Sequence, residues 1–263
     1  MTGEETSPEA ASRSKRRPRR RLGRRAEARR RFLRSVLLGG GLLLLYPLDF
    51  LPPVRRLRSR LRPPGALSDA RFLGACIKCG QCVQVCPVDA VVLADLRDGL
   101  GSGVPYIDPR TQACDFSCDA LSCVLACPTG ALSHDLKVKE EVRMGLARVA
   151  RPDACLARQG KGFTGRARGR GFRGKLRYEE IDRWHPLPIG EHEYSREICD
   201  LCVLECPIGE SALRLERVAG GLKRGAWTPV VGEGCVGCGA CEMICPQEPS
   251  CIVVDPRAEW SPA

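Results

Sequence analysis

Short apolar runs follow cysteine-rich loops throughout the second half and middle of the chain. These runs are Ala90–Leu93, Ala131–Leu132, Ser211–Leu215 and Cys251–Val254. Their length and their content of valine, leucine and isoleucine are typical of short strands. The pattern predicts a small α+β fold in which a strand, a cysteine loop, a short helix and a second strand follow one another.

The N-terminal part of the chain has a different pattern. Residues 1–34 are polar, arginine-rich and without apolar periodicity, so we expect them to be disordered. A hydrophobic signal or anchor segment follows at 35–54, and a basic linker at 55–70. We expect 71–255 to form the folded region, with 156–198 as an insertion and 256–263 as a tail.

The boundary between the basic and the apolar segment resembles an export signal. Arg-Arg-Arg-Phe-Leu-Arg at 29–34 leads directly into an apolar run with three glycines, as in twin-arginine signals. An ordinary membrane anchor is the alternative. Cleavage after Ala66 or Ala70 and retention of 35–51 as an anchor both stay open, although that stretch is short for a membrane span.

The charge of the chain does not indicate a nucleic-acid surface. The net charge is +11, but residues 1–62 hold 18 Lys/Arg against 5 Asp/Glu, whereas the remainder is nearly neutral. The 17 cysteines are an odd and unusually large number, which argues against a framework of disulfides alone.

Sixteen of the cysteines fall into four motifs, three of which are compact. The first and fourth have the regular spacing Cys-x2-Cys-x2-Cys-x3-Cys-Pro, and the other two are irregular variants that also end in Cys-Pro. The four sets are Cys76, Cys79, Cys82 and Cys86; Cys114, Cys118, Cys123 and Cys127; Cys155, Cys199, Cys202 and Cys206; and Cys235, Cys238, Cys241 and Cys245.

This spacing predicts four [4Fe–4S] clusters with these sixteen cysteines as iron ligands. Three close cysteines reach three corners of one cluster, and the fourth serves the other cluster of a two-cluster unit. Gly80, Gly237 and Gly239 allow the positive φ angles that such loops need. Zinc or disulfides are the alternatives, but neither requires a third cysteine in the loop or a repeated Cys-Pro.

Two cysteines, Cys155 and Cys251, are assigned by other arguments. Cys155 is favoured as the distant first member of motif three, because 27 residues separate it from Cys127, as they separate Cys86 from Cys114. Cys251 is expected to be a core cysteine, with the alternative that it replaces Cys155 as a ligand.

The fold class that follows is two bacterial-type, two-cluster ferredoxin-like units. Because motifs one and four share the regular spacing, we expect one to pair with four and two with three. On this pairing Cys245 completes the cluster of motif one, and Cys86 completes that of motif four.

The 156–198 insertion contains a Gly/Arg-rich stretch with two aromatic residues at 160–175. Such a stretch can bind single-stranded nucleic acid, but a solvated, flexible loop that docks an acidic partner or anionic lipid is favoured. The chain has no nucleophile–base pair, phosphate loop or dinucleotide fingerprint. We therefore expect no catalytic residues and no enzyme activity of the chain by itself.

The motifs resemble those of the NapG/MauM ferredoxin-type proteins associated with periplasmic nitrate reduction and methylamine oxidation. The resemblance rests on the export signal, on 60–66, on motif one at 76–87, and on 99–106, 127–132 and 143–147. The long insertion and the missing clean cleavage site depart from the family pattern.

The resemblance implies an electron-transfer subunit at the periplasmic face of the cytoplasmic membrane. It would accept electrons from a polytopic membrane quinol dehydrogenase partner and pass them to a periplasmic c-type cytochrome or reductase. An accessory role in maturing a periplasmic dehydrogenase is the second hypothesis. A nucleic-acid-binding iron–sulfur protein is the third, and the export signal speaks against it.

Overall fold

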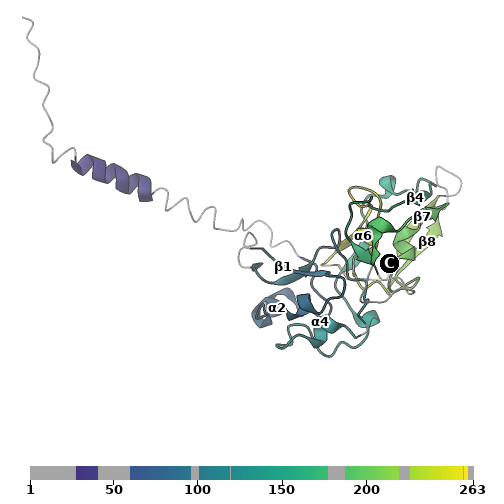
Figure 1. The fold of residues 1–263 in the computed structure, drawn as a ribbon, viewed down its shortest axis with the longest axis horizontal. Coiled ribbons are helices and arrows are strands. Elements are labelled where there is room, and N and C mark those ends of the chain that lie inside the picture. Colours follow the sequence, from purple (N-terminus) through teal and green to yellow (C-terminus); the bar gives the residue numbers. More distant parts are fainter. Residues whose placement is uncertain are drawn as a thin grey trace, which may run out of the picture. The chain divides into compact units, whose positions relative to one another are not determined.

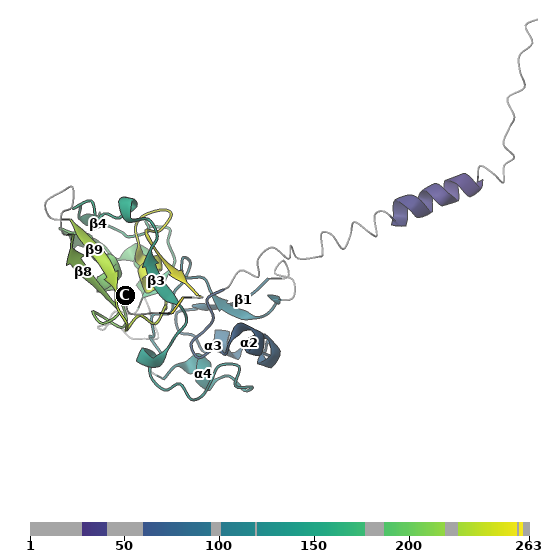
Figure 2. The ribbon, with the colours of Figure 1, turned by 180° about the vertical axis from the view of Figure 1, so that it is seen from behind.

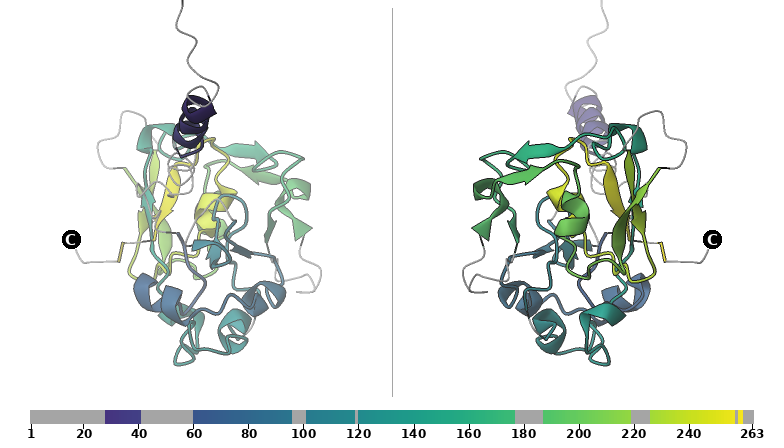
Figure 3. Two further views of the ribbon diagram at one scale, coloured as in Figure 1. Left: turned by 90° about the vertical axis from the view of Figure 1, so that its left-hand side faces the viewer. Right: turned by 90° about the vertical axis from the view of Figure 1, so that its right-hand side faces the viewer.

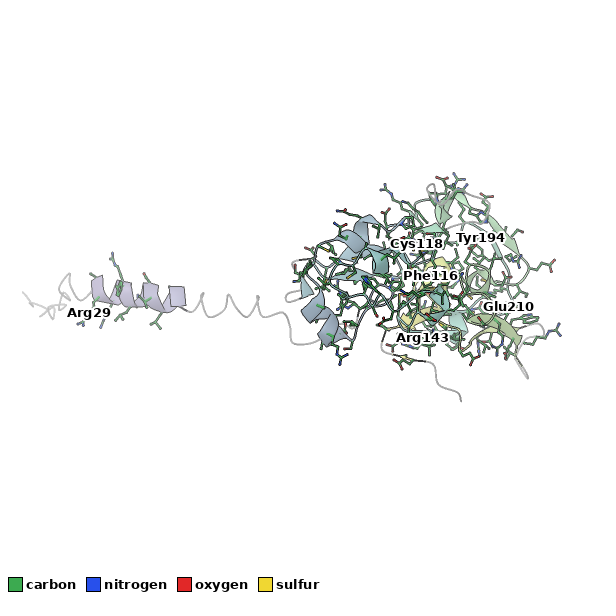
Figure 4. The ribbon with its side chains drawn as sticks, turned by 90° about the horizontal axis from the view of Figure 1, so that it is seen from below. Arg29, Phe116, Cys118, Arg143, Tyr194 and Glu210 are labelled. Atoms are coloured by element: carbon green, nitrogen blue, oxygen red, sulfur yellow. The ribbon has the colours of Figure 1, made fainter. Side chains whose placement is uncertain are left out.

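The computed structural model describes residues 28–40, 60–95, 101–118, 120–176, 187–218, 226–256 and 258–259. The chain divides into two compact units, residues 1–51 and 52–263. In the first unit, residues 28–40 form a helix whose side chains are exposed; Arg29 at its start is labelled in Figure 4. No helix within the described residues has the length and apolar character needed to cross a membrane.

The second unit begins with a segment built on motifs one and two, which we call the first half (residues 60–145). The helices α3 and α4 pack against each other, and the strands β1 and β2 form an antiparallel hairpin between them. Figures 1 and 2 show α2 and α4 on the same side of the body, close to β1. The elements are α2 (Asp69–Ala75), α3 (Gln81–Gln84), β1 (Val91–Leu93), β2 (Pro105–Ile107), α4 (Ser122–Leu125) and η2 (Lys139–Glu141).

Residues 146–256, the second half, repeat this plan around motifs three and four. Helices α5 and α6 pack together, a longer hairpin β8–β9 lies between them in the chain, and β10 pairs with β3. The elements are β3 (Leu146–Val149), η3 (Pro152–Ala154), β4 (Phe163–Gly165), β5 (Lys175–Leu176), β6 (Leu187–Pro188), η4 (Ile189–Glu191), β7 (Tyr194–Arg196), α5 (Leu201–Leu204), β8 (Leu213–Arg217), β9 (Trp227–Val231), α6 (Ala240–Ile244) and β10 (Ile252–Asp255).

The predicted strands are largely present. β1, β8 and β10 coincide with the apolar runs after motifs one, three and four. The run after motif two is reduced to a single antiparallel bridge between Leu132 and Ala66. In Figure 3 the blue to teal helices of the first half gather at one end of the body.

The predicted start of the fold at residue 71 is too late. Leu61, which is 3% exposed, forms an antiparallel bridge with Ile107, and Arg62 forms an ion pair of 2.9 Å with Asp69. Basic composition suggested a linker here, but Arg60 lies over the Tyr106 ring, Arg62 is paired with Asp69, and Leu61 between them is buried. The candidate cleavage positions after Ala66 and Ala70 lie within this folded stretch.

The described part of the insertion is ordered, which corrects the prediction of a solvated, flexible loop. β4 pairs with β7 and β5 pairs with β6. Leu176, Ile189 and Tyr194 are at most 4% exposed, so the insertion has an apolar face of its own that packs into the body. Residues 177–186 lie outside the described residues.

Candidate iron–sulfur sites

The cysteine loops share a backbone conformation that does not depend on glycine. In motifs one and four, Gly80 and Gly239 precede the helix with φ of 76° and 89°, and Gly237 has φ 71°, as predicted. The positions equivalent to these glycines in motifs one and two hold larger residues, which also adopt the left-handed conformation. They are Lys78 (φ 58°), Phe116 (φ 54°) and Leu121 (φ 49°).

These left-handed residues are unfavourable by about 1–2 kcal/mol each where a side chain is present. Sequence reasoning missed them, because lysine, phenylalanine and leucine give no turn signal. The equivalence of motif positions could have revealed them. Phe116, labelled in Figure 4, is 7% exposed, so packing of its ring offsets the backbone cost.

Site 1 combines three cysteines of motif one with the last cysteine of motif two. They line a cavity whose wall also includes Phe72 and Leu132. Cys79 is exposed at this site, whereas Cys82 is buried. The site 1 cysteines are Cys76, Cys79, Cys82 and Cys127.

Site 2 combines the remaining cysteines of motifs one and two. Burial, followed by the neighbouring thiols of Cys118, Cys86 and Cys82, raises the pKa of Cys123 to about 12. Burial also raises the pKa of Cys114 well above its usual value, with Cys123 as a neighbouring thiol. The site 2 cysteines are Cys86, Cys114, Cys118 and Cys123.

Site 3 shows how the distant first member of motif three reaches its partners. The strands β4 and β7 close a hairpin that places the Cys199 N–H 3.0 Å from the Lys161 carbonyl. This brings Cys155 beside Cys199, although 43 residues of chain lie between them. The cysteines of this site line a cavity. The site 3 cysteines are Cys155, Cys199, Cys202 and Cys245.

A fifth cysteine, Cys251, also lines the site 3 cavity and is 3% exposed. The thiols that raise the pKa of Cys202, after burial, are those of Cys199, Cys155 and Cys245. Cys251 lies near Cys155 and against Cys245, to whose sulfur its backbone N–H donates at 3.4 Å. This arrangement favours Cys155 as the fourth ligand, with Cys251 supporting Cys245.

Replacing these two cysteines separately tests that assignment. We expect Cys155→Ala to lose about four irons, because one cluster loses a ligand, and Cys251→Ala to retain the full iron content. Iron and acid-labile sulfide measured on anaerobically purified protein would show the difference. The reverse result would make Cys251 the ligand.

Site 4 combines three cysteines of motif four with the last cysteine of motif three. They line a cavity together with Ala147, Leu213 and Val254. Three of its cysteines are buried. The site 4 cysteines are Cys206, Cys235, Cys238 and Cys241.

These four groups contradict the predicted pairing of motif one with four and two with three. Motif one shares its sites with motif two, and motif three with motif four. The physical reason is that the β1–β2 and β8–β9 hairpins reverse the chain between successive motifs, so that α3 meets α4 and α5 meets α6. Regularity of spacing thus carries no information on pairing.

Backbone N–H groups point at the last cysteine of each motif, the one followed by proline. The sulfur of Cys86 accepts from Ala90 at 3.2 Å, and that of Cys127 from Leu132 at 3.5 Å. Cys206 receives backbone hydrogen bonds from Ile208 and Gly209, which act against the rise of its pKa by burial. Such donors stabilise negative charge on a ligating sulfur.

The chemistry of these sites fits iron–sulfur clusters. Burial, and then the thiols of Cys76 and Cys79, raise the pKa of Cys82 to about 11, because an isolated thiolate is unfavourable in apolar surroundings. Iron reverses this balance, since ligation deprotonates a thiol. Among the described residues, no three His, Cys, Asp or Glu are grouped to hold a single metal ion; at sites 1, 3 and 4 the sulfurs stand around a cavity instead.

Comparison with known proteins agrees with this arrangement. A 4Fe-4S dicluster domain model matches residues 75–131, which contain motifs one and two together, and a 4Fe-4S binding domain model matches residues 232–248. The ferredoxin-type protein NapG of Escherichia coli is 36% identical over 87% of this chain and 85% of its own. The chain belongs to the NapG/MauM family of ferredoxin-type proteins.

Other members of the NapG/MauM family show similar coverage. NapG of Haemophilus influenzae is 34% identical over 87% of this chain and 71% of its own, and the methylamine utilization ferredoxin-type protein MauM of Methylorubrum extorquens is 32% identical over 75% and 73%. No solved structure matches the chain. As a member of the NapG/MauM family, the chain is an iron–sulfur protein that acts in electron transfer.

Proposed function

We propose that the chain carries four [4Fe–4S] clusters and relays single electrons between a membrane partner and a periplasmic acceptor. The observation that carries the proposal is the gathering of sixteen cysteines into four groups of four, three of them around cavities. A [4Fe–4S] cluster, when bound, exchanges one electron at a potential set by its hydrogen bonds and burial.

The residues of the chain would supply ligands, hydrogen bonds and shielding. Thiolates from two motifs hold each cluster, and the N–H groups of Ala90 and Leu132 lie at the sulfurs of the last cysteines. Apolar side chains such as Phe72 and Leu213 exclude water from the cavities. No side chain needs to transform a substrate.

Site 1 is the place where electrons would exchange with a partner. Its Cys79 is exposed, and the neighbouring Ile77 is 64% exposed, so a partner can approach the ligands closely. We propose a polytopic membrane quinol dehydrogenase as electron donor and a periplasmic cytochrome or reductase as acceptor. The twin-arginine pattern at 29–34 supports export and a periplasmic location.

Metal analysis tests the proposed cofactors. Protein purified anaerobically is expected to contain about sixteen irons and about as many acid-labile sulfides, and dithionite reduction should give EPR signals of interacting clusters. A chain with zinc in place of iron would contradict the proposal, as would one with few irons and oxidised, paired thiols. Electron transfer from a quinol to a cytochrome, measured with the membrane partner present, separates the relay from an accessory role.

A further inference from the structure

One of the places where the two halves of the body meet is the loop before motif two, which lies on α6 of motif four. The N–H of Cys114, a site 2 cysteine, donates to the carbonyl of Cys238, a site 4 cysteine, at 3.3 Å. The N–H of Ala113 points at the sulfur of Met243 at 3.2 Å. An added Cβ on Gly239 would lie 2.6 Å from the Pro109 side chain, so the two loops touch without room for a side chain.

Arg110, a residue of the first half, stabilises this contact through hydrogen bonds and an ion pair. Its guanidinium donates to the carbonyls of Glu242, Cys245 and Gln247 at 2.7, 3.0 and 2.6 Å, and forms an ion pair of 2.8 Å with Glu248. Carbonyls at the end of a helix lack intrahelical partners. The arginine therefore caps α6 from outside and reaches the backbone of Cys245, a site 3 ligand.

Residues of the insertion stabilise the same contact. Arg168, whose side chain is 14% exposed, donates to the carbonyls of Arg110 and Met243 at 3.2 Å and lies 3.4 Å from Glu248. Gln112 exchanges two hydrogen bonds with the backbone of Lys175, of 2.9 and 2.7 Å. The Gly/Arg-rich stretch thus contributes the side chain of Arg168 and the backbone of Lys175 to this contact.

Within each half, neighbouring cysteines link one site to the other. Cys82 of site 1 neighbours Cys123 of site 2, and Cys202 of site 3 neighbours Cys241 of site 4. These two contacts lie within one half each and follow from the packing of α3 on α4 and of α5 on α6. The step from site 2 to site 4 is the one that crosses between the halves.

We propose that electrons pass in the order site 1, site 2, site 4, site 3, and that Arg110 and Arg168 hold the Cys114–Cys238 contact at which they cross between the halves. The inference rests on the proposed four-cluster function. In each crossing one electron leaves site 2 and reduces site 4, so one site is oxidised and the other reduced by one electron, and no atom is transferred. Both arginines are positioning residues.

Electron transfer between site 2 and site 4 can be studied separately from the other steps in the full-length protein. A Cys79→Ala, Cys199→Ala background removes sites 1 and 3 and leaves sites 2 and 4, about eight irons. After reduction, its EPR spectrum is expected to show spin–spin splitting between the two remaining clusters. The complementary Cys118→Ala, Cys235→Ala background, which keeps sites 1 and 3, should show none. Splitting in the second background and its absence in the first would overturn the order.

Arginine variants in the Cys79→Ala, Cys199→Ala background test whether Arg110 and Arg168 hold the Cys114–Cys238 contact. We expect Arg110→Ala and Arg168→Ala to keep the iron of that background and lose the splitting, whereas Arg173→Ala, an exposed arginine of the same insertion, should leave it unchanged. If Arg110→Ala loses iron, Arg110→Lys provides the measurement, since lysine cannot reach all four acceptors. Unchanged splitting at full iron content in Arg168→Ala and in either Arg110 variant would overturn the role of the arginines. A parent protein without iron would instead refute the four-cluster function.

Discussion

Removing Cys127 and removing Cys79 are expected to have the same effect, and removing both is expected to have no additional effect. Both cysteines line the site 1 cavity, although they belong to different motifs and 47 residues lie between them. Each single alanine variant should lose about four irons, and so should the double variant, because one cluster is lost in all three cases. Iron and sulfide content per chain is the measurement.

The matched control combines Cys127→Ala with Cys118→Ala. These two cysteines lie in the same motif but in different sites, so this double variant should lose about eight irons. If motif two instead shared its sites with motif three, the Cys127→Ala, Cys79→Ala pair would lose two clusters. Additive loss in that pair would therefore refute the arrangement of sites 1 and 2.

Gly237→Ala is expected to destabilise the folded protein strongly. The residue has φ 71°, and an added Cβ would lie 2.3 Å from the carbonyl oxygen of Gly145. The neighbouring Val236 carbonyl accepts from the Met144 N–H at 3.0 Å, so the loop cannot withdraw without losing this bond. We expect a loss of about 3 kcal/mol from the left-handed backbone and the overlap together, seen as a lower temperature of cluster loss on heating.

Gly209→Ala separates the two contributions. Gly209 has φ 84°, but an added Cβ would meet no atom within 4 Å. Only the backbone cost of about 1 kcal/mol should remain. Equal effects of the two variants would show that the close approach to Gly145 does not limit stability.

Local chemistry explains why part of each site could be predicted from the sequence. Three cysteines within seven residues can serve only one cluster, so Cys76, Cys79 and Cys82 are grouped by covalent geometry alone. The same holds for the glycines before α3 and α6, whose positive φ is required by the tight loop. The short strands after the motifs follow from apolar runs that must be buried.

The pairing of the motifs and the position of the insertion could not be predicted from the sequence. The partner of each three-cysteine set depends on which helices pack together, and that is decided by the β1–β2 and β8–β9 hairpins rather than by spacing. The ordered insertion depends on burial of residues such as Ile189, and on acceptors for Arg168 that lie 58 and 75 residues away. A Gly/Arg-rich composition carries no sign of such acceptors.

The sequence by itself determined that this chain groups its cysteines for iron–sulfur chemistry, since ligand type and local spacing are properties of short segments. Only the tertiary structure decided which motifs share a site, that residues 60–67 belong to the fold, and that the two halves touch at Cys114 and Cys238. The physical reason is that these features arise from packing between segments far apart in the chain. Such packing leaves no pattern in either segment alone.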